Sequence, residues 1–236
     1  MGALAEKTRT REETLRRAHS LSGVVPLGVF LLLHVLVNAS ALGSEQRFTA
    51  SARAFQAIPA ITILEVLFVI APLAFHAIYG VKLARDGSLR SPYPPIWRKW
   101  LHGTGYGAFA FVLLHLWQTS ARKWFYGESP LAFHTTLEAS LSSTVWGIPL
   151  VAIVYLAGIG CTCLHFAAGL WGFSVTWNLS RSDRAKRRGA WTAGAVGALL
   201  FLLGALSVVR YATGSNIVTA TEPLPDGPPR PACSAQ

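Results

Sequence analysis

Five long apolar stretches constrain this 236-residue chain more than any other feature. Each has close to 20 residues or more, which is enough to cross a bilayer as a helix. Hydrocarbon offers backbone groups no partner, so a segment inside it must satisfy its own hydrogen bonds. We therefore predict an all-α membrane protein whose five transmembrane helices cover about 20–42, 60–84, 100–121, 147–178 and 190–212.

The net charge of +10 is distributed in a pattern that indicates membrane topology rather than nucleic-acid binding. Most lysines and arginines lie before the first stretch, between the second and third, or between the fourth and fifth. Basic loops stay on the cytoplasmic side of a membrane and also meet lipid headgroups there. We predict a multi-pass membrane protein with its N-terminus in the cytoplasm and its C-terminus outside.

Four of the stretches each contain one histidine, and their positions convert to depth at about 1.5 Å per residue. His34 and His115 lie on spans that run outward, roughly 21 Å from the inner edge. His76 and His165 lie on spans that run inward, near their cytoplasmic ends. The four histidines therefore form two layers of two, and each layer takes its members from two helices.

Two opposed imidazoles inside an apolar slot are what a b haem requires, because its iron takes axial ligands from both faces of a flat ring. We predict two haem b groups in a four-helix bundle, one held by His34 and His115, the other by His76 and His165. The irons would lie roughly 15 Å apart along the membrane normal. The alternative is that these histidines form helix–helix hydrogen bonds or proton relays.

Several polar residues near the two predicted haems are candidates for contacts with haem propionates or a quinone. At the inner interface these are Arg17, His19, Ser20 and His102, although lipid headgroups are an alternative partner. Glu65 enters the second span from the outer side and is a candidate for an outer quinone or proton-transfer site. Alternatively, Glu65 reaches water or bonds Asn38. His134, in the outer loop, is expected to be solvated.

The same segments resemble a known family, the five-helix di-haem cytochrome b subunits of succinate:quinone oxidoreductases. The resemblance extends over about 16–180. It depends on motifs in each of the first four spans: Arg16-Arg17-Ala18-His19-Ser20-Leu21-Ser22-Gly23-Val24-Val25-Pro26 with His34 and Asn38; Glu65 with Pro72-Leu73-Ala74-Phe75-His76-Ala77-Ile78-Tyr79-Gly80-Val81; Thr104-Gly105 with His115-Leu116-Trp117; and His165-Phe166 with Gly169-Leu170-Trp171 and Thr176-Trp177.

The resemblance implies a membrane anchor, in the bacterial cytoplasmic membrane, for a flavoprotein subunit with FAD and an iron–sulfur subunit, both on the cytoplasmic side. Succinate would be oxidised outside this chain, which would have no catalytic residues of its own. Electrons would pass from the iron–sulfur subunit through the two b haems to a membrane quinone, commonly menaquinone in this family. In reverse, the same complex would reduce fumarate. The family's ligand pairing agrees with the pairing derived from depth.

This interpretation divides the chain into three parts. Residues 1–15 are a flexible cytoplasmic segment, 16–212 the five-helix cytochrome b domain, and 213–236 a proline-rich, disordered outer tail. Two alternatives stay open: a di-haem, quinone-reactive subunit of a hydrogenase or formate dehydrogenase, and a haem-free anchor or transporter. A higher oligomer of the complex is compatible with the sequence.

Overall fold

The computed structural model describes residues 2–86, 94–129 and 132–214, and throughout these ranges the chain is built from helices without strands. The predicted all-α class is therefore confirmed. In chain order the helices are α1 (Gly2–Val24), α2 (Pro26–Ala39), η1 (Ser40–Leu42), α3 (Glu45–Gln56), α4 (Ile61–Glu65), η2 (Val66–Ile70), α5 (Ala71–Arg85), α6 (Pro95–Leu116), η3 (Trp117–Ala121), α7 (Arg122–Tyr126), α8 (Phe133–Leu141), α9 (Leu150–Thr176) and α10 (Asp183–Thr213).

Four helical segments are long and apolar enough to cross a membrane. They correspond to the first, second, fourth and fifth predicted spans: Arg11–Leu42, Ile61–Arg85, Leu150–Thr176 and Asp183–Thr213. The third predicted span, 100–121, is helical as α6 and η3 but does not reach the same apolar length. Its crossing of the membrane stays a prediction that rests on its place in the bundle.

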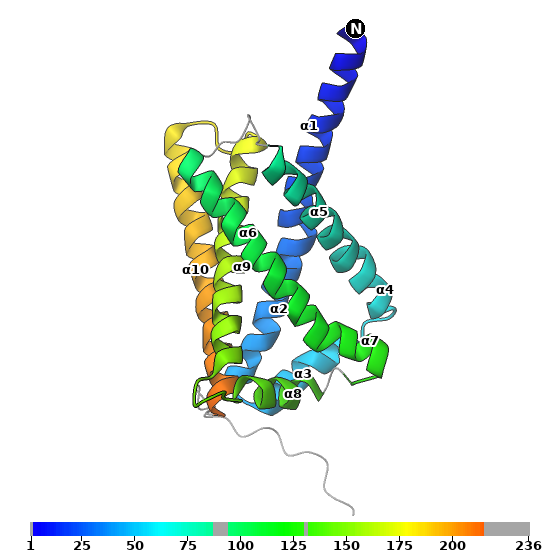
Figure 1. Ribbon diagram of the computed structural model, residues 1–236, viewed down its shortest axis with the longest axis vertical. Helices are drawn as coiled ribbons and strands as arrows, with labels where there is room; N and C mark the ends of the chain where they lie inside the picture. Colours follow the sequence, from blue (N-terminus) through cyan, green and yellow to red (C-terminus); the bar gives the residue numbers. More distant parts are fainter. Residues whose placement is uncertain (1, 87–93, 130–131, 215–236) are drawn as a thin grey trace, which may run out of the picture.

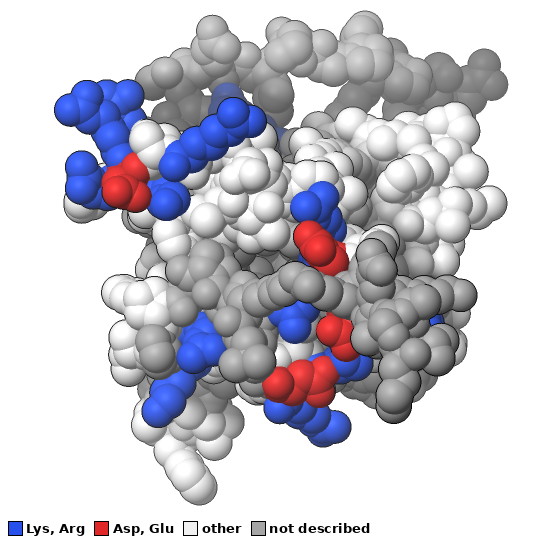
Figure 2. All heavy atoms as spheres, turned by 90° about the horizontal axis from the view of Figure 1, so that it is seen from above, with Lys and Arg blue, Asp and Glu red and all other residues white. Residues whose placement is uncertain are grey.

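The long helices run along one axis, with α9 and α10 side by side and α6 crossing in front of them (Figure 1). The helix α1 projects from one end of this bundle, which we call the α1 end. Across the opposite end lie α3 and α8, and we call it the α8 end. Figure 2 looks down on the α1 end and shows basic side chains at several places around it, as expected for a cytoplasmic surface.

The first helix begins well before the predicted start of the first span. Residues 2–15, predicted as a flexible segment, form the first turns of α1, which is helical from Gly2 onward. The first span is interrupted at Val25, because Pro26 starts a new helix, although the bond from the Val29 amide to the Val25 carbonyl (3.0 Å) bridges the break. Of the predicted outer tail, 215–236 lie outside the described residues.

Close packing between α6 and α9 depends on Gly158. A Cβ added to this residue would lie 2.2 Å from Cγ of Phe111, far inside van der Waals contact. The ring of Phe111 also packs against Tyr155 and His115, which limits its freedom to move. The absence of a side chain at Gly158 therefore sets how closely these two helices approach.

We predict that Gly158→Ala destabilises the folded chain by about 1–3 kcal/mol, because the added methyl group overpacks the contact with Phe111. Thermal unfolding of the purified protein in detergent measures this loss. The matched control is Gly194→Ala on α10, where an added Cβ would have no neighbour within 4 Å and should leave the unfolding temperature unchanged or raise it. Equal behaviour of the two variants would contradict the assignment.

Candidate functional site

The structure brings the four span histidines together in two pairs, each from two helices. In one pair, His34 of α2 and His115 of α6 have ring centroids 5.6 Å apart and an interplanar angle of 76°. In the other, His76 of α5 and His165 of α9 are 6.1 Å apart at 84°. All four rings are half-buried. These are the pairs that depth along the spans predicts.

The two pairs lie at different heights of the bundle, and two glycines show by how much. A Cβ on Gly23 would lie 2.5 Å from His76, and one on Gly105 would lie 2.9 Å from His165. Gly23 is therefore level with His76. On the span that contains Gly23, His34 follows eleven residues later. At about 1.5 Å per residue, this separation is roughly 16 Å along the helix, close to the predicted spacing of the two layers.

Three of the four histidines have their Nδ1 atom engaged by an oxygen. Nδ1 of His76 donates to the backbone carbonyl of His19 (3.1 Å), and Nδ1 of His165 donates to that of Leu101 (3.2 Å). Nδ1 of His115 lies 3.3 Å from the hydroxyl of Tyr155. A proton held on Nδ1 leaves the lone pair on Nε2, which is the arrangement of a metal-binding imidazole with its outer-shell partner.

This geometry fits a metal centre held between two imidazoles. A ligand nitrogen lies about 2 Å from its metal ion and about 1 Å from the ring centroid, so two opposed rings should be roughly 6 Å apart. The observed 5.6 and 6.1 Å agree with this spacing. Clusters of three or more metal-binding side chains are absent from the described ranges. A haem iron needs only two protein ligands, since the macrocycle supplies the other four.

His34 differs from the other three. Its Nε2 lies 3.4 Å from the side-chain amide nitrogen of Asn38, one turn further along α2. The same amide donates to the backbone carbonyl of His34 at 2.9 Å. Binding of a metal through Nε2 would end the longer contact and keep the shorter one, so Asn38 would not be left without a partner.

The residues predicted at the inner interface gather near the His76–His165 pair in different ways. His19 stacks on His76 with ring centroids 4.1 Å apart and an interplanar angle of 14°, and its buried Nδ1 has no hydrogen-bond partner among the described residues. Arg17 lies over the ring of Trp177 at 5.9 Å, beside the end of α9. Ser20 and His102 are half-buried next to this group, His102 directly following Leu101.

Glu65 forms an ion pair that the sequence pattern does not predict. Its carboxylate accepts from Nζ of Lys123 at 2.9 Å, and both side chains are partly buried. Asn38, one of the two alternatives, bonds His34 instead, and the Glu65 side chain is 30% exposed. Both partners lie next to a π-helical turn. Glu65 directly precedes η2, and Lys123 lies on α7, which directly follows η3. Such turns are frequent at functional positions because they rotate the residues beyond them.

A second ion pair lies beside the first on the same short helix. Arg122 of α7 binds the carboxylate of Glu128 through Nε at 2.8 Å. Hydrogen bonding to this guanidinium lowers the pKa of Glu128, and the same contact raises the pKa of Arg122. The turn after α7 therefore stays ion-paired throughout the neutral pH range.

His134 is not solvated, so that expectation was wrong. The side chain is only 1% exposed, because α8 folds back across the bundle and places it between Phe48 and Tyr211. Its Nδ1 lies 3.7 Å from Glu138, whose other oxygen lies 3.6 Å from the buried Arg210. The sequence gives no sign of this cluster, since it joins an outer loop to the end of α10.

The chain is similar in sequence to a characterised protein. It is 31% identical over 181 residues to the succinate dehydrogenase cytochrome b558 subunit of Bacillus subtilis (strain 168). The similar region covers 75% of this chain and 86% of that subunit. No family model matches the chain. No solved structure matches it either.

We predict that Glu65 and Lys123 stabilise the α4–α7 contact by about 1 kcal/mol, between the values for exposed and buried ion pairs. The test is a double-mutant cycle of Glu65→Gln, Lys123→Met and the combined variant, followed by thermal unfolding. Either single change should cost stability, and the second should then cost less. Strictly additive losses would show that the two side chains do not interact.

Proposed function

Since the chain belongs to the cytochrome b subunits of succinate dehydrogenase, we propose that it binds two b haems and conducts electrons from succinate to a membrane quinone. His34 and His115 would hold one haem, and His76 and His165 the other. The dehydrogenase chemistry would take place in other subunits, so no residue here acts on succinate.

One observation carries this proposal: the four span histidines lie in two opposed pairs, and three of them have Nδ1 already bonded to an oxygen. A histidine that served only as a link between helices would have no need of a second imidazole facing it at metal-binding distance. The fixed tautomer is also the one that a metal ligand requires. Together these features favour haem ligation over a haem-free anchor or transporter.

The residues of the chain perform three tasks in this proposal. The imidazoles would bind the haem iron, and their Nδ1 partners keep each ring in one orientation. The glycines at 23 and 105 let neighbouring helices approach those rings closely. A b haem, when bound, supplies an iron that takes up and releases one electron at a time. The apolar helices around the pairs exclude water from the space between them.

Sidedness follows from the basic α1 end, which we assign to the cytoplasm, with the C-terminal tail outside. An iron–sulfur subunit and a flavoprotein subunit would dock there, next to His19, Arg17, Ser20 and His102. These four residues are our candidates for contacts with haem propionates or an inner quinone. The direction of electron flow can reverse, in which case the complex would reduce fumarate.

The quinone would react at the α8 end, where Glu65 is our candidate for proton exchange, and we expect menaquinone. The ion pair with Lys123 would keep the Glu65 carboxylate oriented at the edge of the bundle. A quinone-reactive subunit of a hydrogenase or formate dehydrogenase is the second candidate, but the similarity to a succinate dehydrogenase subunit favours the first.

We predict two b haems per purified chain, one of which is lost in His34→Ala and the other in His165→Ala. A reduced-minus-oxidised spectrum and a haem determination on the detergent-purified complex measure both outcomes. His134→Gln is the matched control, since His134 is a buried histidine outside the two pairs, and it should keep both haems. The absence of b-type bands, or their full survival in a His34→Ala/His76→Ala variant, would refute haem ligation by these residues.

A further inference from the structure

The His115 side chain is connected to the surface by a short chain of hydrogen bonds. The hydroxyl of Tyr155 on α9 donates to the side-chain carbonyl oxygen of Gln118 at 2.5 Å. Because the hydroxyl proton is used in that bond, the Tyr155 oxygen is free to accept from Nδ1 of His115, which lies 3.3 Å away. Gln118 in turn lines a cavity of about 310 Å³ between η3 and α8.

Packing fixes this connection in place. Tyr155 is 5% exposed, and its ring packs edge-on against Phe111, which stacks on His115. The phenol therefore has little rotational freedom, and its hydroxyl is held at the imidazole. Among the described residues, no other hydroxyl or carbonyl group is hydrogen-bonded to Nδ1 of His115.

We propose that Tyr155 and Gln118 are positioning residues that fix the tautomer of His115 and make it a more basic ligand. An accepting oxygen at Nδ1 increases the electron density on Nε2, and hydrogen bonds in a chain strengthen one another. A more basic ligand stabilises the oxidised iron, so the contact lowers the reduction potential of the haem that His115 holds. This inference rests on the proposed haem ligation.

The decisive variant is Tyr155→Phe, which removes the hydroxyl and keeps the ring. Redox titration of the purified complex, followed by its b-type absorbance, should show a higher midpoint potential for the His34–His115 haem and an unchanged potential for the His76–His165 haem. Haem retention at the first site should fall about tenfold or more. Gln118→Leu should move the potential in the same direction by a smaller amount.

Tyr211→Phe is the matched control, because Tyr211 is equally buried at the α8 end but its hydroxyl has no described hydrogen-bond partner. Equal potentials in Tyr155→Phe and the wild-type protein would overturn the inference and leave haem ligation intact. The same shift in Tyr211→Phe, or a shift of both haems, would overturn it too. A wild-type complex without the haem at His115 would refute the proposed function together with this inference.

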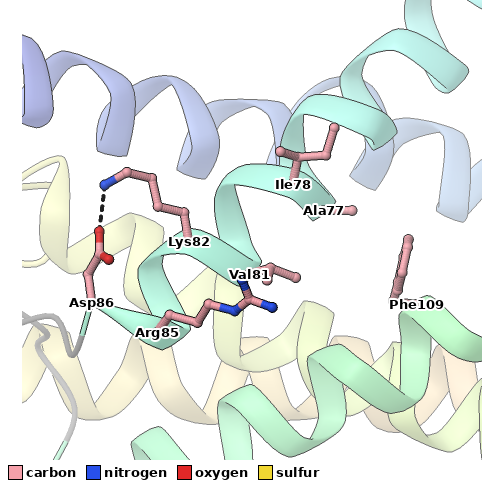
Figure 3. Close-up of a pocket in the computed structure, with 7 residues that line it drawn as sticks. All are labelled: Ala77, Ile78, Val81, Lys82, Arg85, Asp86 and Phe109. Atoms are coloured by element: carbon pink, nitrogen blue, oxygen red, sulfur yellow. Dashed lines mark hydrogen bonds and ion pairs between the residues drawn. The ribbon is translucent and has the colours of Figure 1, made fainter.

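A separate observation concerns the lipid-facing side of α5. A cavity of about 460 Å³ is lined by Ala77, Ile78, Val81 and, from α6, Phe109, with charged residues at one end (Figure 3). At 100° per residue, Val81 lies about 140° around the helix from His76. The cavity therefore faces away from the proposed haem site, and Ile78 on its floor is 73% exposed.

At the charged end of this cavity, Lys82 and Arg85 differ in their ion pairing with the described residues. Lys82 points to Asp86 and forms an ion pair with it at 2.5 Å, whereas Arg85 extends along the side of the helix that faces Val81 and Phe109 (Figure 3). Arg85 has no ion pair with any residue that the structure describes. It is also the last residue of Ile61–Arg85, a segment long and apolar enough to cross a membrane, and the end of such a span meets the lipid headgroups.

We infer that this cavity binds an anionic phospholipid, with the phosphate at Arg85 and an acyl chain along the apolar floor. A basic residue above an apolar groove at the end of a span complements both halves of such a lipid. A zwitterionic lipid would gain less, because its own cation competes with Arg85. A soluble anion would gain nothing from the floor.

The test uses the full chain in nanodiscs of equal phosphatidylglycerol and phosphatidylcholine, released into the gas phase for native mass spectrometry. The wild-type protein should retain phosphatidylglycerol preferentially, and Arg85→Gln should reduce that retention about fivefold. Val81→Trp should reduce it as well by filling the floor. Arg184→Gln, a basic residue of α10 outside the cavity, is the control. Equal retention of both lipids, or no loss in Arg85→Gln, would overturn the inference.

Discussion

The structure depends on the need to satisfy imidazole rings inside an apolar bundle. A histidine in hydrocarbon has two ring nitrogens that require partners, and leaving either one unpaired costs free energy. In three of the four span histidines, Nδ1 meets an oxygen from a different helix. Each of these bonds leaves the lone pair on Nε2 of its ring, and the opposing ring of each pair lies 5.6 or 6.1 Å away between centroids.

The same glycine contacts set both the distance between neighbouring helices and the position of the imidazole rings. Gly23 and Gly105 contact the rings of His76 and His165, so the histidines of one layer are each wedged against a neighbouring backbone. Gly158 does the same for Phe111, which stacks on His115. A side chain at any of these glycines would separate two helices and, with them, an imidazole from its partner. These glycines therefore influence the site by setting how closely the helices approach one another.

The depth of each span histidine in the bundle could be predicted from the sequence, whereas the direction in which each side chain points around its helix could not. A constant rise per residue places His34 level with His115, and His76 level with His165, once the direction of each span is known. The stacking of His19 on His76 and the partner of Glu65 depend on helix rotation and on π-helical turns, which periodicity does not reveal. The burial of His134 depends on how α8 folds back across the bundle, and nothing local to that loop specifies it.

The two histidine pairs also differ in the kind of group that holds them. His76 and His165 donate to backbone carbonyls, whose positions are set by the helices themselves. His115 donates to a tyrosine side chain, and that tyrosine to a glutamine beside a cavity at the α8 end. A backbone acceptor cannot be removed by substitution, whereas a side-chain acceptor can. The pair nearer the predicted iron–sulfur subunit is therefore held by the helix backbone, and the pair nearer the predicted quinone depends on the identity of two side chains.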